Sequence, residues 1–336
     1  MRAALFQGAG IPLAIAQVTE PEPGPTDAII RVARCGICGS DIHMTSGHAM
    51  DYPAGTILGH EYAGEVVAVG RDVTSLKVGD RIAAMPATGC GHCAACLAGQ
   101  PMSCFQWEGR LGGFGEYLRA AEASAVKLPE ALSFADGALV EPLAVSLNGV
   151  QLAGMTPGAL VLVIGAGAVG LAAIYWARLM GAGRIVAASP SRRRAALALQ
   201  MGADAFETLG EGEADRINTA LGGMPEIVIE CAGAVGLLQQ SIELAGPRAR
   251  IISLGFCTQP DPILPSLATW KRVSLGFGFS WSIDQFRHAV DTLDRGHVEP
   301  RLMISDTVSL DALPATFEAI RNGAAQTKVQ VDPWSA

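Results

Sequence analysis

One stretch of the chain, which opens GICGSDIH and closes GHE, gathers side chains that can bind metal and carry protons. Thiolate, imidazole and carboxylate groups are ligand types of catalytic zinc ions. Cys38, His60 and Glu61 are therefore candidate ligands of a catalytic metal. Ser40 and His43 follow the cysteine at two and five residues and are candidates for a proton relay beside that metal. A turn serine and a strand-end histidine are the alternative interpretations of these two residues.

Four closely spaced cysteines form a second candidate metal site. Their spacing is C-x2-C-x2-C-x7-C, and the residues are Cys90, Cys93, Cys96 and Cys104. Four thiolates complete a tetrahedron and leave no open position for a substrate, so the spacing predicts a structural zinc ion. Iron–sulfur ligation, a redox pair and a metal-free cysteine cluster are the alternatives.

A glycine-rich turn predicts a dinucleotide-binding site. The apolar run Leu160–Ile164 is typical of a buried parallel strand, and a helical segment follows from Leu171 to about Met180. Between them lies the sequence GAGAVG, whose candidate cofactor-binding residues are Gly165, Gly167, Ala168, Val169 and Gly170. Glycines at this point permit a tight turn and a close approach of the backbone to a pyrophosphate at the helix N-terminus. A purely structural glycine turn is the alternative.

The end of the next strand bears on the choice between NAD and NADP. An NAD site usually places Asp or Glu roughly 20 residues after the glycine turn, to bind the ribose hydroxyls. The strand predicted at 184–188 instead ends at Ser189 and is followed by PSRRR. Ser189 is expected to cap the next helix, while Arg192, Arg193 and Arg194 oppose the helix dipole unless a phosphate binds there. Ser189, Arg193 and Arg194 are therefore further candidate cofactor-binding residues. We predict a preference for NADP(H) over NAD(H), with a solvated basic turn as the alternative.

The elements that must position these groups fall into distinct regions. Residues 1–143 contain short strand candidates separated by Gly, Pro and Asp turns, which is typical of a β-rich domain. Residues 144–276 alternate strand-like and helical runs, which predicts βαβ units on a doubly wound parallel sheet. Residues 277–336 add two helices and a last strand. The predicted fold class is therefore α/β.

Composition excludes several kinds of partner. The chain has 336 residues, a net charge of −8 and no basic block, so we expect no nucleic-acid partner. Residues 156–177 carry no charge and are about long enough to span a bilayer, but glycines and Pro157 interrupt them. A strand–turn–helix explains this segment better, so we expect no membrane partner. The N-terminus lacks the apolar core of a signal peptide, which predicts a cytoplasmic protein.

With these motifs placed, the chain resembles the zinc-dependent medium-chain dehydrogenase/reductase family, which includes alcohol, polyol, butanediol and threonine dehydrogenases. The resemblance rests on GICGSDIH, GHE, the four-cysteine loop, EPLAVSLNGV at 141–150 and GAGAVG. It implies a GroES-like β-barrel catalytic domain over 1–143 and a Rossmann coenzyme domain over 144–276. The segment 277–336 is then expected to return to the catalytic domain.

The resemblance also implies roles for individual residues. Glu141 is implied as a further ligand of the catalytic zinc, because polyol and butanediol enzymes carry Glu there. From the residues alone, it fits equally a surface carboxylate or a helix-start residue. Glu61 is expected either to bind the ion or to lie just behind it, and Asp41 is expected to orient a ligand histidine. Lys328, in the closing KVQVDP, is implied in cofactor binding, and His48 is expected in a surface loop.

The implied activity is reversible hydride transfer between nicotinamide and a small alcohol, which is a secondary alcohol, diol or polyol, or its ketone or aldehyde. Two zinc ions per chain are expected, one catalytic and one structural, together with a homo-oligomer, either a dimer or a tetramer. The proton is expected to leave through Ser40, a nicotinamide ribose hydroxyl and His43. The alternatives are an NAD-dependent polyol or amino-alcohol dehydrogenase and a non-catalytic, cofactor-binding relative. Zinc-free quinone and enoyl reductases share the fold but lack these cysteines.

Overall fold

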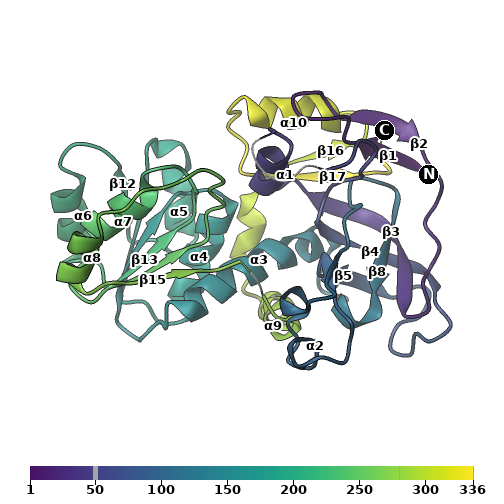
Figure 1. Cartoon of the computed structure of the whole chain (residues 1–336), viewed down its shortest axis with the longest axis horizontal. Helices are drawn as coiled ribbons and strands as arrows, with labels where there is room; N and C mark the ends of the chain where they lie inside the picture. Colours follow the sequence, from purple (N-terminus) through teal and green to yellow (C-terminus); the bar gives the residue numbers. More distant parts are fainter. Residues whose placement is uncertain (48–51, 280, 336) are drawn as a thin grey trace. The chain divides into compact units, whose positions relative to one another are not determined.

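The computed structural model describes residues 1–47, 52–279 and 281–335, so His48 lies outside the described residues. The chain divides into two compact units, which are described separately (Figure 1). The first unit comprises Met1–Ala144 and Ser280–Ala336, and the second comprises Val145–Phe279. The C-terminal segment thus shares a unit with the N-terminal region.

The first unit is built on a mixed sheet. Within its described residues, seven strands join in the order β16-β17-β3-β4-β5-β9, with β8 paired to β3. Their bounds are β3 Asp27–Gly36, β4 Glu61–Val69, β5 Arg81–Ala84, β8 Tyr117–Ala121, β9 Ala125–Lys127, β16 Ile304–Ser309 and β17 Lys328–Asp332. Two small antiparallel pairs accompany it: β1 Arg2–Leu5 with β2 Ala14–Gln17, and β6 Ala87–Thr88 with β7 Glu108–Gly109. Strand β3 pairs with both β4 and β17, which brings the GHE turn and the C-terminal strand together.

Short helices surround this sheet. Their bounds are α1 Gly39–Met44, α2 Ala94–Leu97, α9 Ile283–Asp294 and α10 Leu313–Arg321, with 3-10 turns at Pro101–Ser103, Glu122–Ser124 and Glu299–Met303. A longer helix, α3 Phe134–Leu152, begins in the first unit and ends in the second. Leu313 and Phe317 anchor α10 in the hydrophobic core that fills the unit.

The second unit is a doubly wound parallel sheet. In its described residues, six parallel strands lie in the order β12-β11-β10-β13-β14-β15. Their bounds are β10 Leu160–Ile164, β11 Arg184–Ser189, β12 Ala205–Thr208, β13 Ile227–Glu230, β14 Arg250–Ser253 and β15 Ser274–Phe277. This order, in which the chain leaves the centre in both directions, is that of dinucleotide-binding Rossmann sheets.

Helices cover both faces of this parallel sheet (Figure 1). Their bounds are α4 Ala168–Leu179, α5 Ala195–Gln200, α6 Glu213–Leu221, α7 Leu237–Leu244 and α8 Pro265–Lys271. Leu162 and Ile164 of β10 pack on the side of α6 and α7, in a core that includes Ile217 and Ile242. Alternate residues of the same strand face the other side, as a strand buried on both faces requires.

The glycine turn after β10 adopts the expected geometry. Gly165 has φ +95°, a conformation that favours glycine, and Gly167 is the N-cap of α4. A Cβ on Gly170 would lie 1.8 Å from the Gly165 carbonyl oxygen, so helix and strand can approach only without a side chain there. The uncharged run at 156–177 therefore forms β10, this turn and part of α4. Over the residues that the structure describes, no helix has both the length and the apolar character needed to cross a membrane.

The predicted capping role of Ser189 is wrong. Ser189 is the last residue of β11, paired in register with Thr208, and its carbonyl accepts a hydrogen bond from Leu209 N at 3.1 Å. The following 3-10 turn spans Arg192–Arg194, and Ser191 occupies its N-cap position. Strand pairing extends β11 farther than the local helix signals suggest.

Candidate metal and cofactor sites

Three potential metal ligands converge at the start of β4. The ligand atoms of Cys38, His60 and Glu61 all lie within 4.8 Å of one another. Gly59, just before them, has φ +87°, and a Cβ there would lie 2.6 Å from the Phe114 ring. The tight turn therefore needs glycine, and it sets His60 and Glu61 at the start of β4, close to Cys38, the N-cap residue of α1.

Asp41 orients His60, as the sequence predicts for this carboxylate. One Asp41 oxygen lies 3.1 Å from His60 Nδ1, and the other accepts a hydrogen bond from Cys38 N at 3.0 Å. Burial alone would lower the pKa of His60, but the charge of Asp41, the hydrogen bonds to Asp41 and Cys38 and the charge of Cys38 together outweigh it and hold that pKa well above its usual value. Because Nδ1 contacts Asp41, Nε2 is the nitrogen available to a metal ion. Metal-binding histidines usually pair their other ring nitrogen with a carboxylate in this way.

The two proposed relay residues lie on the short helix α1. Ser40 Oγ is 3.5 Å from His60 Nε2, so the hydroxyl borders the candidate metal position. His43 is one turn farther along the helix and exposed. Residues three apart in a helix lie on the same face. The structure thus places a hydroxyl beside the ligands and an imidazole toward water, on one side of α1.

Glu61 is not a free carboxylate. Lys328 Nζ lies 2.6 Å from both Glu61 oxygens and donates a further hydrogen bond to Ile37 O at 3.1 Å. The two side chains are 1% and 3% exposed, so the pair is buried. A Cβ on Gly36 would meet a Glu61 oxygen at 1.9 Å, which explains the glycine at that point of β3. The implied role of Lys328 in cofactor binding stays a prediction; what the structure shows is its pairing with Glu61.

Glu141 faces the same buried region from α3. It is 4% exposed and lies in the interior of the helix, directly before Pro142, so neither a surface position nor a helix start describes it. Among the described residues it is not part of the tight ligand set. Burial raises its pKa to about 8; the charges of His60 and Lys328 oppose this rise and that of Glu61 adds to it.

The buried charges fit a divalent cation. Asp41, Glu61 and Glu141 are 1%, 0% and 4% exposed. Among the described residues, the buried ammonium group of Lys328 pairs with Glu61 and the imidazole of His60 pairs with Asp41. Buried carboxylates are strongly unfavourable unless cations or hydrogen bonds compensate them. Thiol, imidazole and carboxylate donors around an excess of buried acid are the chemistry of a zinc site with room for substrate.

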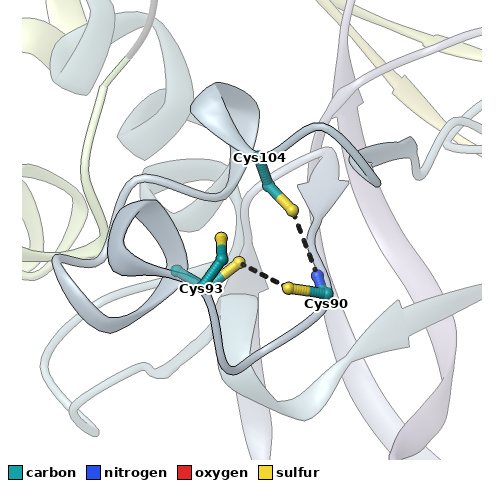
Figure 2. A group of neighbouring side chains, drawn as sticks. Cys90, Cys93 and Cys104 are labelled. Atoms are coloured by element: carbon teal, nitrogen blue, oxygen red, sulfur yellow. Dashed lines mark hydrogen bonds between the residues drawn. The ribbon is translucent and has the colours of Figure 1, made fainter.

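The four loop cysteines form a separate cluster. Their sulfur atoms all lie within 4.8 Å of one another, and Cys90 Sγ is 4.0 Å from Cys96 Sγ. A tetrahedral zinc site with bonds of about 2.3 Å places its sulfurs roughly 3.8 Å apart. Figure 2 shows the sulfurs of Cys90, Cys93 and Cys104 turned toward one another. All four cysteines are free of disulfide bonds, so the cluster can hold a metal.

Backbone donors favour the thiolate form of two of these cysteines, Cys90 and Cys104, whereas burial raises the pKa of Cys96 to about 12. Cys104 Sγ accepts hydrogen bonds from Cys90 N at 3.5 Å and Gln106 N at 3.3 Å, and these lower the pKa of Cys104 to about 6. A Cβ on Gly89 would lie 2.5 Å from Cys96 Sγ, so the loop closes only with glycine there. His92 is exposed and its Nδ1 lies 2.8 Å from Cys90 O, away from a ligand role.

The predicted adenosine end of the cofactor site lies after β11. Arg192 donates a hydrogen bond to Phe206 O at 3.1 Å and its guanidinium lies 5.7 Å from the Phe206 ring centroid, so this arginine is tied to β12. Burial and the neighbouring charge of Arg193 lower the pKa of Arg194. Ser189 stands where an NAD site usually carries an acid.

Two long-range contacts around the candidate metal site and helix α1 are not indicated by any local pattern in the sequence. Lys328 meets Glu61 from 267 positions away, and Arg321 reaches α1 from 279 positions away. Both cations come from the C-terminal segment, whose pairing with the barrel local patterns do not specify.

Comparison with known proteins agrees with this geometry. A family model described as an alcohol dehydrogenase GroES-like domain matches residues 24–130, and one described as a zinc-binding dehydrogenase matches residues 168–295. The chain is 35% identical over 316 residues to a sorbitol dehydrogenase of Gallus gallus, covering 90% of this chain and 88% of that protein. The predicted fold class, a GroES-like barrel with a Rossmann domain, is confirmed.

The chain is also similar to solved structures over nearly their whole length. One from Sinorhizobium meliloti 1021, described as a zinc-binding dehydrogenase bound to NADP, has a TM-score of 0.88 and 32% identity and covers 99% of both chains. Another, of rspB from E. coli CFT073 with NADH, has a TM-score of 0.89 and 28% identity and covers 99% of both chains. The chain therefore belongs to the zinc-dependent medium-chain dehydrogenase/reductase family and is a zinc-containing, NAD(P)-dependent alcohol dehydrogenase.

Proposed function

We propose that this dehydrogenase prefers NADP(H) and interconverts a secondary alcohol, diol or polyol with its carbonyl compound. The observation that carries the proposal is the convergence of Cys38, His60 and Glu61, with ligand atoms within 4.8 Å of one another. A hydroxyl and an exposed imidazole, on Ser40 and His43, stand beside that cluster. The family relationship supports the same reaction class.

In this proposal Cys38 and His60 hold the catalytic zinc, and Glu61 and Glu141 supply the carboxylates that complete or adjust its ligand set. When bound, zinc supplies Lewis acidity toward the substrate oxygen. Asp41 keeps the His60 ring in one orientation through its 3.1 Å contact with Nδ1. The four-cysteine loop holds the second, structural ion, so metal analysis should find about two zinc ions per chain.

The proton that leaves the alcohol needs a route to water. Ser40 Oγ lies 3.5 Å from His60 Nε2, close enough to the ligand set to accept a proton from a substrate hydroxyl placed there. His43 lies one turn away and is exposed, and imidazoles exchange protons with water near neutral pH. We assign Ser40 as the inner group of the relay and His43 as its exit, with a ribose hydroxyl of the cofactor between them.

The basic turn after β11 supports NADP(H). Ser189 leaves no carboxylate to repel a 2′-phosphate, and Arg193 and Arg194 are adjacent cations at the start of the next helical segment. Their mutual repulsion is relieved when a phosphate binds between or beside them. Arg192 is excluded from this role because its guanidinium contacts Phe206.

The substrate class follows from Glu141 and from the relatives. Among similar proteins are a sorbitol dehydrogenase of Gallus gallus and, at 30% identity, a D-xylulose reductase of Scheffersomyces stipitis. Glu141 is the carboxylate expected of polyol and butanediol enzymes. We therefore rank vicinal diols and polyols above simple primary alcohols.

The test is a substrate panel run with both cofactors. Secondary alcohols, diols, polyols and their ketones are incubated with NADP(H) or NAD(H), and nicotinamide absorbance gives kcat/KM for each pair. The proposal predicts the highest value for a diol or polyol with NADP+. A higher kcat/KM with NAD+ would overturn the cofactor assignment, and no turnover of any substrate with either cofactor would favour a non-catalytic relative.

A further inference from the structure

The helix that carries both relay residues is short and depends on contacts at its two ends. Helix α1 has 6 residues, fewer than an isolated helix needs to be stable in water. Its N-terminal end is fixed by Asp41, whose carboxylate holds Cys38 N and His60 Nδ1. The position of Ser40 and His43 then depends on what fixes the other end.

Arg321 of α10 holds the C-terminal end of α1. Its Nη1 donates to Ile42 O at 3.3 Å, and its Nη2 donates to Thr45 Oγ1 at 2.9 Å. Thr45 Oγ1 in turn donates to Asp41 O at 2.7 Å. Carbonyls of the last helical turn have no partner within the helix, and a cation is favourable at that end. One guanidinium therefore connects to the backbone of Asp41, whose side chain orients His60.

The guanidinium is itself held firmly. Phe317, on the preceding turn of α10, is fully buried and packs edge to face on Phe114 at 6.4 Å between centroids. Arg321 lies over the Phe317 ring at 5.5 Å, and its Nε contacts Glu318 oxygens at 3.3 and 3.2 Å. The acid neutralises the guanidinium, which argues against an anion site. These contacts within α10 fix the Arg321 guanidinium independently of its hydrogen bonds to α1.

We infer that Arg321 is a positioning residue for the proton relay. By fixing the last turn of α1, it fixes the rotation of the helix about its axis. That rotation keeps Ser40 Oγ beside His60 Nε2 at 3.5 Å and keeps His43 on the exposed side. This inference rests on the relay of the proposed function. It assigns the C-terminal segment a part in catalysis that no motif of the segment indicates.

The experiment compares Arg321→Ala with three other variants. Thr45→Val keeps the shape of a side chain that is 2% exposed and removes the hydroxyl that links Arg321 to Asp41 O. Arg321→Lys keeps the charge with fewer donors. The matched control is Arg287→Ala, because Arg287 also pairs with an acid three residues earlier, Asp284, on an exposed face of α9.

The measurements are the pH profile of kcat for alcohol oxidation, zinc content and the midpoint of thermal unfolding. Arg321→Ala and Thr45→Val should lower kcat at neutral pH by about tenfold or more, which is part of the roughly 10²–10⁴-fold that a positioned proton-transfer group contributes. The loss should shrink at high pH, where hydroxide removes the proton, and added imidazole should restore part of the rate. Zinc content should equal that of the wild type. Arg321→Lys should recover part of the loss, and Arg287→Ala should match the wild type.

The outcomes separate this inference from the proposed function. If the wild type oxidises alcohols and His43→Ala shifts the pH profile, but Arg321→Ala and Thr45→Val leave it unchanged, the positioning role is overturned and the proposed function stands. A fall in kcat that is equal at every pH, or that follows a loss of zinc, would also overturn it, because the role would then be structural. A wild type without turnover fails the proposed function itself.

Discussion

Lys328 Nζ lies 2.6 Å from both carboxylate oxygens of Glu61, and both side chains are almost fully buried. This contact joins the strand that follows the GHE turn to the last strand of the chain. The Glu61 carboxylate therefore has two possible cationic partners. It is bound by the ammonium group of Lys328, and it also lies among the potential metal ligands. Lys328 and a metal ion would compete for this carboxylate, and substitution of either Lys328 or Glu61 should shift that competition.

Lys328→Met should destabilise the protein strongly. Removing one partner of a buried ion pair leaves an uncompensated charge, at a cost of about 3–5 kcal/mol in the free energy of unfolding. Lys127→Met is the matched control, because Lys127 pairs with Asp80 at a side-chain exposure of 52% and should cost less than about 1 kcal/mol. Urea unfolding of the zinc-loaded proteins measures both. Adding Glu61→Gln to Lys328→Met should recover part of the loss; equal effects of the two lysine variants would contradict a buried pair.

The double variant Arg193→Ala, Arg194→Ala should weaken NADP+ use selectively. Each charge-assisted hydrogen bond to phosphate is worth about 1.5–3 kcal/mol, so KM for NADP+ should rise at least about tenfold while KM for NAD+ changes little. Arg184→Ala, at the opposite end of β11, is the control and should leave both values unchanged. Steady-state kinetics with each cofactor gives the answer. A similar rise of KM for NADP+ and for NAD+ would mean that the arginines do not bind the 2′-phosphate.

Protonation of the buried Asp136 carboxylate should lower the free energy of unfolding at acidic pH. Burial alone would raise the pKa of Asp136, but hydrogen bonds from Arg301 at 2.7 and 2.9 Å and from Ser133 outweigh it and lower that pKa. A carboxylate whose pKa is lower in the folded state adds stability above its unfolded pKa of about 3.9, and the contribution is lost as the pH falls through the folded pKa.

Asp136→Asn should therefore flatten the acid limb of the stability profile and cost about 1–3 kcal/mol at neutral pH. The measurement is urea unfolding between pH 3 and pH 7. Asp284→Asn, at an exposed acid of α9, should leave the profile unchanged. An acid limb as steep in Asp136→Asn as in the wild type would show that other groups control it.

Cys104→Ser should remove the structural ion without removing catalysis. Three thiolates bind zinc less tightly than four, so zinc content should fall by about one ion per chain and the unfolding temperature by at least about 5 °C. Turnover at low temperature should largely persist, because the catalytic ligand set is a separate cluster. His92→Ala, in the same loop, is the control and should keep both zinc ions. Unchanged zinc content in Cys104→Ser would remove the structural-site assignment.

Much of the fold could be predicted because its signals are local. The apolar run at 160–164 forms β10 with the predicted bounds, and the following glycines form the turn into α4. The strand predicted at 184–188 likewise forms β11, which extends one residue farther to Ser189. Buried parallel strands and glycine turns are specified within a few residues, so a single sequence contains them.

The errors and omissions have a different origin. Ser189 has the residue type of a helix cap, yet pairing with β12 draws it into β11. The environment of Glu141 depends on where α3 packs, so its burial could not be derived from neighbours in sequence. The contacts of Lys328 and Arg321 depend on the C-terminal strand and helix joining the barrel, which is a property of the tertiary structure.

Cys38 belongs to the proposed catalytic metal site, and replacing its thiol is the sharpest test of that site. Cys38→Ser should lower kcat by at least about a thousandfold, because the Lewis acid is lost, while dinucleotide binding and the structural zinc ion remain. The measurement is kcat together with zinc content on the same preparation. About one zinc ion per chain and negligible turnover are expected; near wild-type turnover with that single ion would show that Cys38 does not hold a catalytic metal.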